Sequence, residues 1–514
     1  MITHRLAELL GALSLATDGA NGMPPETALR TAIVATEVGR ASGFGADALH
    51  DAYMTALLRF LGCTAYAHET ATRYGAGDDQ ALLRAVMTAD AARAMDVMRR
   101  VSRGLGGGAS LARRAAALAR LSTDPEPVDA LVLAHCGLAT ALAARLGVSA
   151  GVVRALGEVF ERHDGRGSPG RLAGDAIDPV ARLVVVAFRV VTFHAIEGRE
   201  AAMDAVRARR GSELDPRLAG AFLDVAGDVL AAIDGDSVWE TFLDAEPRPL
   251  AWVPAGDLVQ IAEAFSDYAD LKSPFTLGHS RGVAALAAQV AGEVGLDAEE
   301  RARLHLAALL HDLGRVAVPN GIWDKPGPLN RIERERVDAH AWHTARILGR
   351  SPLFAAIAPI AAGAHERVDA SGYPRAIPGD LSPASARVLA ACDVFHALGE
   401  ERAYRPAHGR DASAAVLVDE ARAGRLDARV VSAVLAASGA RQRKPRVSSD
   451  GLSEREVEVL CLIARGLSNK EIAARLGISA KTVQHHVAHV YEKTGVRTRA
   501  AAAIYAVDRR LLDR

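Results

Sequence analysis

Six side chains between residues 279 and 393 are of the types that hold metal ions. Four are imidazoles and two are carboxylates: His279, His311, Asp312, His340, His365 and Asp393. They fall at predicted helix ends or on helical faces, where an unpaired carboxylate is costly to bury. Mixed nitrogen and oxygen ligands suit manganese or iron better than a thiolate-bound zinc. These residue types therefore predict a site for divalent metal ions, two at most.

The central pair of this set is His311-Asp312, which ends the apolar run Ala307–Leu310 and precedes Gly314. An isolated His-Asp pair is usually an ordinary helix end, but here the other candidate ligands surround it in the sequence. We expect Asp312 to bridge two metal ions and to be catalytic. Two ions held in this way clamp a phosphodiester and lower the pKa of a bound water for in-line attack.

Helices must position these side chains, and the composition favours them. The 514-residue chain is half hydrophobic and only 4% aromatic, and alternating Val, Ile and Thr runs are rare. This composition predicts an all-α protein, and the length suggests about three domains. Four cysteines without a CxxC pair give no sign of a disulfide framework or a zinc ribbon. The net charge of −1 indicates no particular class of partner.

The sequence contains an internal repeat. A shift of 252 residues aligns 55–62 with 307–314, and a shift of 205 residues aligns 161–167 with 366–372. The difference of 47 residues indicates an insertion in the first copy, at about 72–120. We therefore predict two tandem copies of one helical domain.

The two copies differ in chemistry at the predicted metal positions. Five of the six positions are changed in the first copy, where the aligned residues are Thr27, Arg59, Phe60, Phe160 and Phe188. Only His135, which aligns with His340, keeps its type. We predict that the first copy binds no metal and serves as a sensing or dimerising domain, or as a packing scaffold.

The motifs of the second copy resemble the HD-GYP branch of the HD phosphohydrolase superfamily. In order they are GHSRGV, LLHDLGR, KPGPL, His340, HERVDASGYP, ACDVFHAL and RAYR, spread over about 190 residues. The resemblance implies an all-helical domain with two or three metals that hydrolyses cyclic di-GMP. It also places all six candidate ligands at ligand positions of the family.

Five departures from the family pattern weaken the predicted enzyme. Ala364 stands where the family has the first of two consecutive histidines, so one ligand is absent. Arg315 replaces a lysine that meets the substrate phosphate, which keeps the charge and changes the geometry, and we retain it as a catalytic candidate. Phe275 replaces a carboxylate of three-metal members. His396 replaces an aspartate, and Ala370 replaces a glycine.

The C-terminal stretch has the capping pattern of a helix-turn-helix domain. Ser453, Ser468 and Ser479 each precede a short amphipathic segment, and Leu476–Ser479 forms a tight turn between two helices. Residues 441–514 carry 15 Lys and Arg against eight Asp and Glu, a net charge of +7 that suits phosphate binding.

This stretch, LSEREVEVLCLIARGLSNKEIAARLGISAKTVQHHVAHVYEKTGV, resembles the LuxR-type DNA-binding domain. The resemblance implies double-stranded DNA as a partner, a recognition helix at 480–494 and a fourth helix at about 499–511 that dimerises. The groove-facing positions it implies are Lys481, Gln484, His485 and Ala488, and Gln484 suits an adenine edge. The candidates for phosphate contacts are Asn469, Lys470, Thr482 and Lys493.

The predicted organisation has four parts. They are a degenerate HD-GYP-like domain at 1–240, an HD-GYP-like domain with most ligands at 250–440, a basic linker at 441–450 and a LuxR-type domain at 451–514. With no leader and no run of 18 uninterrupted apolar residues, we expect a cytoplasmic protein without a membrane partner, and a homodimer.

Three functions stay open on this basis. The first is a LuxR-type transcriptional regulator whose HD-type domains sense a ligand, such as a cyclic dinucleotide or a metal. The second is a metal-dependent phosphodiesterase, acting on cyclic di-GMP or a related phosphoester, with a DNA-binding tail. The third is a scaffold with two inert HD copies. The intact helix-turn-helix and the altered hydrolase blocks favour the first.

Overall fold

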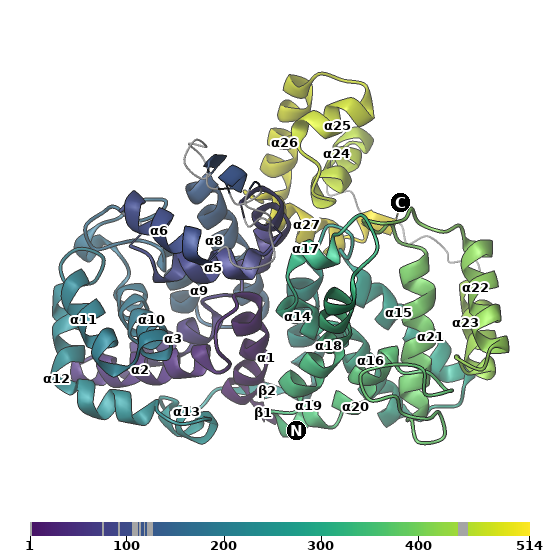
Figure 1. Cartoon of the computed structure of the whole chain (residues 1–514), viewed down its shortest axis with the longest axis horizontal. Coiled ribbons are helices and arrows are strands. Elements are labelled where there is room, and N and C mark those ends of the chain that lie inside the picture. The colour runs from purple at the N-terminus through teal and green to yellow at the C-terminus, as the bar shows by residue number, and fades with distance from the viewer. Residues whose placement is uncertain are drawn as a thin grey trace. The chain divides into compact units, whose positions relative to one another are not determined.

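The computed structural model describes residues 3–439 and 451–513, except 75–76, 91–92, 105–111, 113–114, 118 and 121–126. The linker predicted at 441–450 lies outside the described residues, and the insertion predicted at 72–120 lies partly outside them. The prediction of an all-α fold is confirmed, because helices make up most of the described chain (Figure 1). The chain divides after Ile261 into two compact units.

The first unit is a set of helices with one short antiparallel sheet, in which Thr3 pairs with Pro254 and Arg5 with Trp252. Its elements are β1 Thr3–Arg5, α1 Leu6–Ala20, α2 Thr27–Ala41, α3 Ala46–Leu58, η1 Cys63–Tyr66, α4 Ala67–Glu69, η2 Thr70–Tyr74, α5 Asp79–Thr88, α6 Ala94–Gly104, α8 Pro127–Arg145, α9 Ala150–Glu158, η3 Gly174–Ala176, α10 Pro179–Glu197, α11 Arg199–Arg209, α12 Pro216–Ala232, α13 Trp239–Ala245, β2 Trp252–Pro254 and η4 Ala255–Asp257.

Helix α10 is the centre of the first unit and packs against α2, α3 and α11. Asp178 caps its first turn, Pro179 suits the first helical position, and Gly198 follows its end with a φ of +92°. By length and composition α10 is apolar enough to cross a membrane, but 72% of its apolar window is buried inside the unit. Its apolar residues are therefore those of a core helix.

The second unit holds two groups of helices. The first group runs from α14 Leu258–Asp270 through α15 His279–Glu293, α16 Ala298–Leu310, η5 Leu313–Ala317, α17 Asn320–Trp323, α18 Arg331–Leu348, α19 Pro352–Ala355, α20 Ala358–Ala362, η6 Gly363–His365, α21 Ala384–Leu398, α22 Arg410–Arg422 and α23 Ala428–Gly439. The second group comprises α24 Glu454–Ala464, α25 Asn469–Leu476, α26 Ala480–Thr494, α27 Arg499–Asp508 and η7 Leu511–Asp513.

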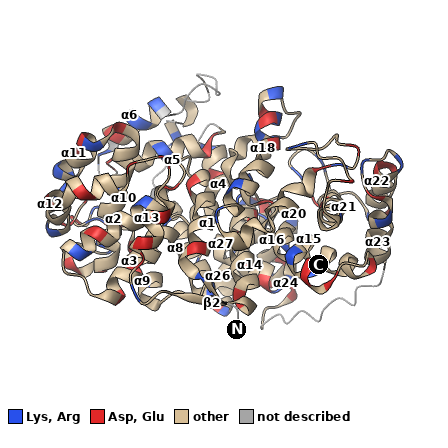
Figure 2. Ribbon diagram, turned by 90° about the horizontal axis from the view of Figure 1, so that it is seen from below, with Lys and Arg blue, Asp and Glu red and all other residues tan. Residues whose placement is uncertain are grey.

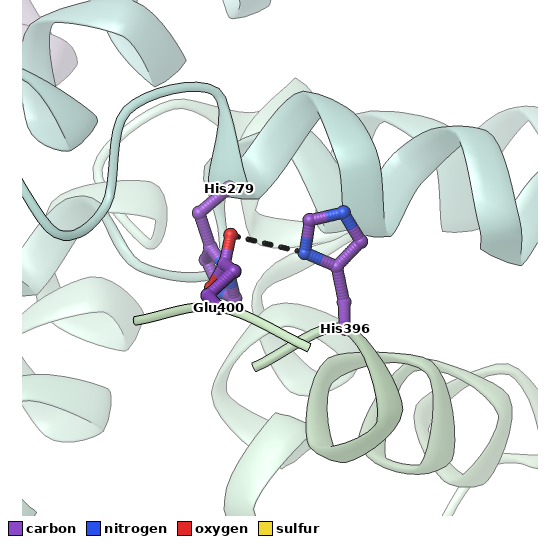
Figure 3. Close-up of side chains that lie close together, drawn as sticks. All are labelled: His279, His396 and Glu400. Atoms are coloured by element: carbon purple, nitrogen blue, oxygen red, sulfur yellow. Dashed lines mark hydrogen bonds and ion pairs between the residues drawn. The ribbon is translucent and has the colours of Figure 1, made fainter. Parts of the chain in front are cut away.

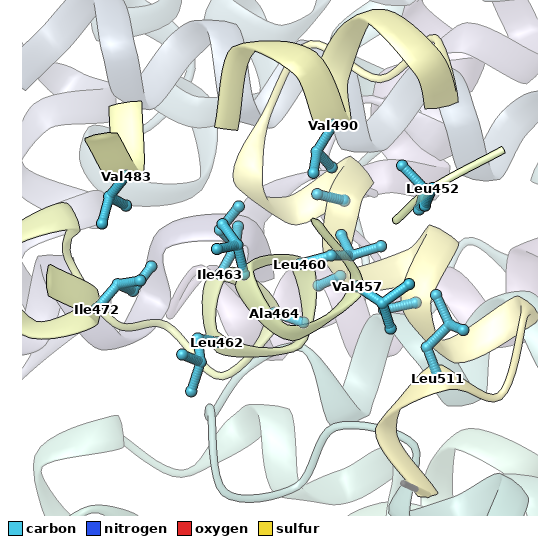
Figure 4. Close-up of a cluster of buried hydrophobic side chains, with 14 of the residues drawn as sticks. Leu452, Val457, Leu460, Leu462, Ile463, Ala464, Ile472, Val483, Val490 and Leu511 are labelled. Carbon is cyan, nitrogen blue, oxygen red and sulfur yellow. The ribbon is translucent and has the colours of Figure 1, made fainter. Parts of the chain in front are cut away.

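The four C-terminal helices begin where the sequence predicts them. Ser453 and Ser468 form capping boxes with Glu456 and Glu471, and the Ser479 hydroxyl accepts a hydrogen bond from the backbone of Thr482. Their apolar faces meet in one core, shown in Figure 4. Its fully buried members include Val459, Leu460, Ile472, Val483 and Val490. The fourth helix ends at Asp508, three residues before the predicted end.

The buried Glu456 carboxylate should measurably stabilise this C-terminal core. It accepts hydrogen bonds from the backbone of Ser453 at 2.7 Å and from Lys493 Nζ at 2.7 and 2.9 Å. Hydrogen bonds from Lys493 and then Ser453 lower the pKa of Glu456 from 4.5 to about 2. We expect Glu456→Gln to lower the free energy of unfolding by about 1 kcal/mol at neutral pH.

Hydrogen exchange of the α24 amides in the full chain, compared between variants at equal pH, measures this difference. A carboxylate with a depressed pKa stabilises above its unfolded pKa, so the advantage of the wild type should shrink as the pH falls from 4.5 toward 2. The control is Glu454→Gln, at an exposed position in the same first turn. A constant difference across this pH range would contradict the prediction.

Candidate metal centre

The helices of the second unit bring the six predicted ligands together. His279 is the first residue of α15, His311 and Asp312 directly follow α16, His340 lies on α18, His365 ends η6, and Asp393 lies on α21. Gly314 permits this convergence, because a Cβ at that position would collide with the carbonyl of His340. All the side chains are largely withdrawn from solvent, and those of His279 and His311 are fully buried.

Asp312 lies at the centre of the cluster. Its Oδ1 is 3.4 Å from Nε2 of His340, 3.7 Å from Nε2 of His311 and 3.8 Å from Nε2 of His365. Its Oδ2 is 3.8 Å from Nε2 of His279. One carboxylate facing four imidazoles has the arrangement expected of a bridging metal ligand.

The second carboxylate, Asp393, closes the cluster from α21. Its Oδ1 lies 3.2 Å from Nε2 of His279 and 3.7 Å from Nε2 of His311. Its Oδ2 lies 3.6 Å from Nδ1 of His365. Asp393 therefore shares three of the four imidazoles that face Asp312.

Backbone acceptors orient two of the imidazoles toward Asp312. Nδ1 of His311 lies 2.8 Å from the carbonyl oxygen of Ala308, and Nδ1 of His340 is bonded to that of Val337. An imidazole that donates from Nδ1 presents the lone pair of Nε2 on its other side. This is the tautomer that a metal ligand requires.

The donor atoms fit a divalent cation. Among the described residues, Nε2 of His311 and Oδ1 of Asp312 are buried and have no hydrogen-bond partner. Buried polar atoms without partners are destabilising, and a cation between these two would satisfy both. Two groups of possible ligands share Asp312: one adds His279 and His311, and the other adds His340 and His365.

The electrostatics of the cluster also favour a cation. Burial alone would raise the pKa of Asp312 and of Asp393, but Arg315 for the first and the neighbouring imidazoles for both hold these pKa values well below 3.8. Burial, and then His340, lowers the pKa of His365 to about 4, so this ring is neutral at pH 7.

Against burial, which lowers both values, Glu400 and Asp393 raise the pKa of His279 to about 10, and Asp312 and Asp393 raise the pKa of His311. The carboxylates thus hold positive charge at these two rings, and a bound metal ion would take the place of the protons.

Arg315 contacts the centre of the cluster rather than solvent. Its Nη1 lies 3.1 Å from Oδ2 of Asp312, and its guanidinium lies 3.9 Å from the centroid of the Trp323 ring. The sequence did not single out Trp323, which also donates a hydrogen bond to the carbonyl of Arg315. The catalytic role of Arg315 stays a prediction.

The missing ligand has no replacement among the described residues. Ala364 is fully buried, and the groups of possible ligands around Asp312 contain no side chain that takes its place. Sequence analysis did, however, miss one neighbour of the cluster, Glu400, which lies against His279 together with His396 (Figure 3). The spacing of four residues between His396 and Glu400 was the available signal.

The aligned positions of the first unit also converge, around an arginine. The guanidinium of Arg59 lies 4.5 Å from the ring centroid of Phe188, 5.2 Å from Phe160 and 5.7 Å from Phe60. Nε2 of His135 lies 2.8 Å from the carbonyl oxygen of Arg59. The described part of this unit contains no group of possible metal ligands.

Two glycines add a second parallel between the units. A Cβ on Gly62 would collide with the carbonyl of His135, as one on Gly314 would with that of His340. These contacts support the predicted internal repeat.

Burial, and then Arg189, lowers the pKa of Arg59 to about 9, so this side chain is mainly charged at neutral pH.

Helix α26 exposes the residues predicted to face the DNA groove, namely Lys481, Gln484, His485 and Ala488. Of the phosphate-contact candidates, Lys470, Thr482 and Lys493 are exposed, and Lys493 also binds Glu456. Asn469 accepts a hydrogen bond from Arg499. Basic and acidic side chains are otherwise interspersed over the helices (Figure 2). The DNA contacts of all these residues stay predictions.

Comparison with known proteins places these features in a family. Residues 263–430 match the family model described as HD domain, and residues 450–506 match that of the bacterial regulatory proteins of the luxR family. The chain is 30% identical over 420 residues to the 3'3'-cGAMP-specific phosphodiesterase 3 of Vibrio cholerae, covering 81% of this chain and 91% of the relative. The chain therefore belongs to the HD-GYP-type family of HD-domain proteins, with a LuxR-type domain added.

Two further comparisons agree with this assignment. A crystal structure of a cyclic GMP-AMP specific phosphodiesterase of Vibrio cholerae, V-cGAP3, superimposes with a TM-score of 0.59 at 26% identity, over 86% of this chain and 99% of that one. The cyclic di-GMP phosphodiesterase response regulator RpfG of Xanthomonas campestris is 40% identical over 153 residues, or 29% of this chain and 40% of the relative.

We expect Asp312→Ala to remove most of the metal that the purified protein binds. Losing a partner that only orients a ligand lowers metal affinity roughly 10–100-fold, so losing a ligand shared by two ions should lower it further. Inductively coupled plasma mass spectrometry after loading with manganese or iron measures the content per chain. The control is His305→Ala, on α16 directly before His311-Asp312 and outside the cluster. Unchanged metal content in Asp312→Ala would exclude this site.

Proposed function

We propose that the chain is a DNA-binding protein that hydrolyses 3'3'-linked cyclic dinucleotides at the metal centre of its second unit. The observation that carries this proposal is the buried Asp312 carboxylate, which faces four imidazoles and shares three of them with Asp393. Similarity over 91% of the length of a 3'3'-cGAMP-specific phosphodiesterase supports the substrate class. Cyclic GMP-AMP and cyclic di-GMP are the two candidate substrates.

The proposed centre holds two divalent ions of manganese or iron. His279 and His311 would hold one ion and His340 and His365 the other, with Asp312 shared between them. When bound, the ions supply Lewis acidity and lower the pKa of a bound water. The ionised carboxylates would balance the charge of the buried ions. Arg315, which contacts Asp312, would add a positive charge that attracts the substrate phosphate.

We propose that the C-terminal domain binds the enzyme to double-stranded DNA. We propose α26 as the recognition helix and α27 as a homodimer contact, which is the role that the LuxR resemblance implies. DNA binding also supports the cytoplasmic location that the sequence predicts. The first unit, with Arg59 in place of metal ligands, is proposed as a sensing or dimerising domain.

A second candidate function is ligand sensing without turnover. Two observations favour it: Ala364 removes one ligand, and Arg315 is already engaged by Asp312. In this case the second unit binds a cyclic dinucleotide and changes DNA binding, while the phosphodiester stays intact. This candidate is the regulator that the sequence favoured first.

Hydrolysis distinguishes the two candidates. We expect the protein loaded with manganese or iron to convert cyclic GMP-AMP or cyclic di-GMP to the linear dinucleotide, and Asp312→Ala to abolish the conversion. Liquid chromatography of the nucleotides, with His305→Ala as the control, measures this. Tight nucleotide binding by a metal-loaded protein with no linear product would overturn the proposed hydrolysis and leave the sensing function.

DNA binding is tested with fragments selected from genomic DNA by the protein itself. Gln484→Ala should lose about 1–3 kcal/mol of discrimination at one base position, because a bidentate base contact is removed. Lys470→Ala, at an exposed phosphate-contact candidate, should weaken binding and reduce the salt dependence by about one phosphate contact. The control is Arg429→Ala, at an exposed position on α23. Equal affinities of all variants in a mobility-shift titration would contradict the assignment of α26.

A further inference from the structure

Each ligand imidazole needs a partner that fixes its orientation, and His279 has an unusual one. His311 and His340 bond through Nδ1 to backbone carbonyls three residues earlier. His279 is the first residue of α15, so no preceding helical turn points a carbonyl at its ring. Its Nδ1 instead lies 2.9 Å from Oε2 of Glu400, which is 121 residues away in the sequence.

Glu400 is itself held in place by two other side chains. Nη2 of Arg402 lies 2.7 Å from Oε2 of Glu400, and Nδ1 of His396 lies 3.1 Å from Oε1 (Figure 3). Arg402 is anchored in turn by the carbonyl of Phe275. The absence of a side chain at Gly282 makes room for the ring of His396, because a Cβ there would collide with it. The carboxylate is therefore fixed rather than mobile.

The ring of His279 spans the gap between Glu400 and the metal cluster. Its Nδ1 faces Glu400, while its Nε2 lies 3.2 Å from Oδ1 of Asp393 and 3.8 Å from Oδ2 of Asp312. A carboxylate that accepts the Nδ1 proton fixes the tautomer and the orientation of a ligand imidazole and raises its basicity. The ring itself is fully buried while Glu400 is in place, so Nδ1 has this carboxylate and not bulk water as its partner.

The alternative is that Glu400 binds a metal ion directly with His279 and His396. The geometry disfavours this reading for two reasons. The Oε2 atom of Glu400 is already engaged by His279 and Arg402. The Oε1 atom of Glu400 lies 3.1 Å from Nδ1 of His396, so both carboxylate oxygens already have partners.

We propose that Glu400 is a positioning residue, which holds the His279 ring so that Nε2 faces Asp312 and Asp393, where it would bind a metal ion. The inference rests on the metal centre of the proposed function and does not require nucleotide hydrolysis. The centre lacks the ligand that Ala364 replaces. A charged partner that fixes the orientation of His279 would recover part of the metal affinity that this loss removes.

Metal affinity tests the proposal independently of activity. Metal is titrated into the full chain against a chelator of known affinity, and the apparent dissociation constant and the stoichiometry are read together. Glu400→Ala should weaken metal binding roughly 10–100-fold with the same stoichiometry at saturation. Glu400→Gln keeps the size and an amide oxygen acceptor, so it should lie between the wild type and Glu400→Ala. The matched control, Glu401→Gln at the next, exposed position, should bind as the wild type does.

The other outcomes overturn the proposal. An affinity within twofold of the wild type for both Glu400 variants would show that the carboxylate does not position His279. Loss of one whole ion per chain at saturation in Glu400→Ala would make Glu400 a direct ligand instead. If Glu400→Ala does not fold, Glu400→Gln carries the test. A wild type that binds metal but hydrolyses no cyclic dinucleotide would refute the proposed enzyme and leave this inference standing.

Discussion

The buried negative charge of Asp312 is the constraint on which the second unit depends. Four imidazoles and Arg315 surround the carboxylate, and its Oδ1 still has no hydrogen-bond partner among the described residues. Desolvated charges are tolerated only when they are compensated, so the residues around Asp312 are of types that donate to it or share a cation with it. Several features place compensating side chains around this carboxylate: the helix start at His279, the end of α16 just before His311, the close approach at Gly314 and the position of Asp393.

Sequence reasoning predicted the features that depend on residues close to one another in the chain. Serine caps predicted the starts of α24, α25 and α26, because a capping side chain bonds within three residues of its own position. The ligand types and their order predicted which side chains would converge. The bond between His279 and Glu400 and the stacking of Arg315 on Trp323 could not be predicted in this way, because they depend on how the chain packs.

The same limit applies in the C-terminal domain. Lys493 follows the pattern of a phosphate-binding lysine, yet its ammonium group binds Glu456, which also closes the first capping box. One glutamate thus links the start of α24 to the last turn of α26. The sequence did not predict this ion pair, because it joins residues 37 positions apart; the DNA contact of Lys493 stays a prediction.

The two units differ in the source of the positive charge at their centres, which Arg59 supplies in the first unit. Its cation is part of the polypeptide, enclosed by Phe60, Phe160 and Phe188, and is therefore present whenever the first unit folds. A metal ion at Asp312 would come from solution. A ligand that binds only the folded state stabilises that state by an amount that rises with the logarithm of the ligand concentration. If the proposed centre binds metal, removing the metal should lower the stability of the second unit and leave that of the first unchanged.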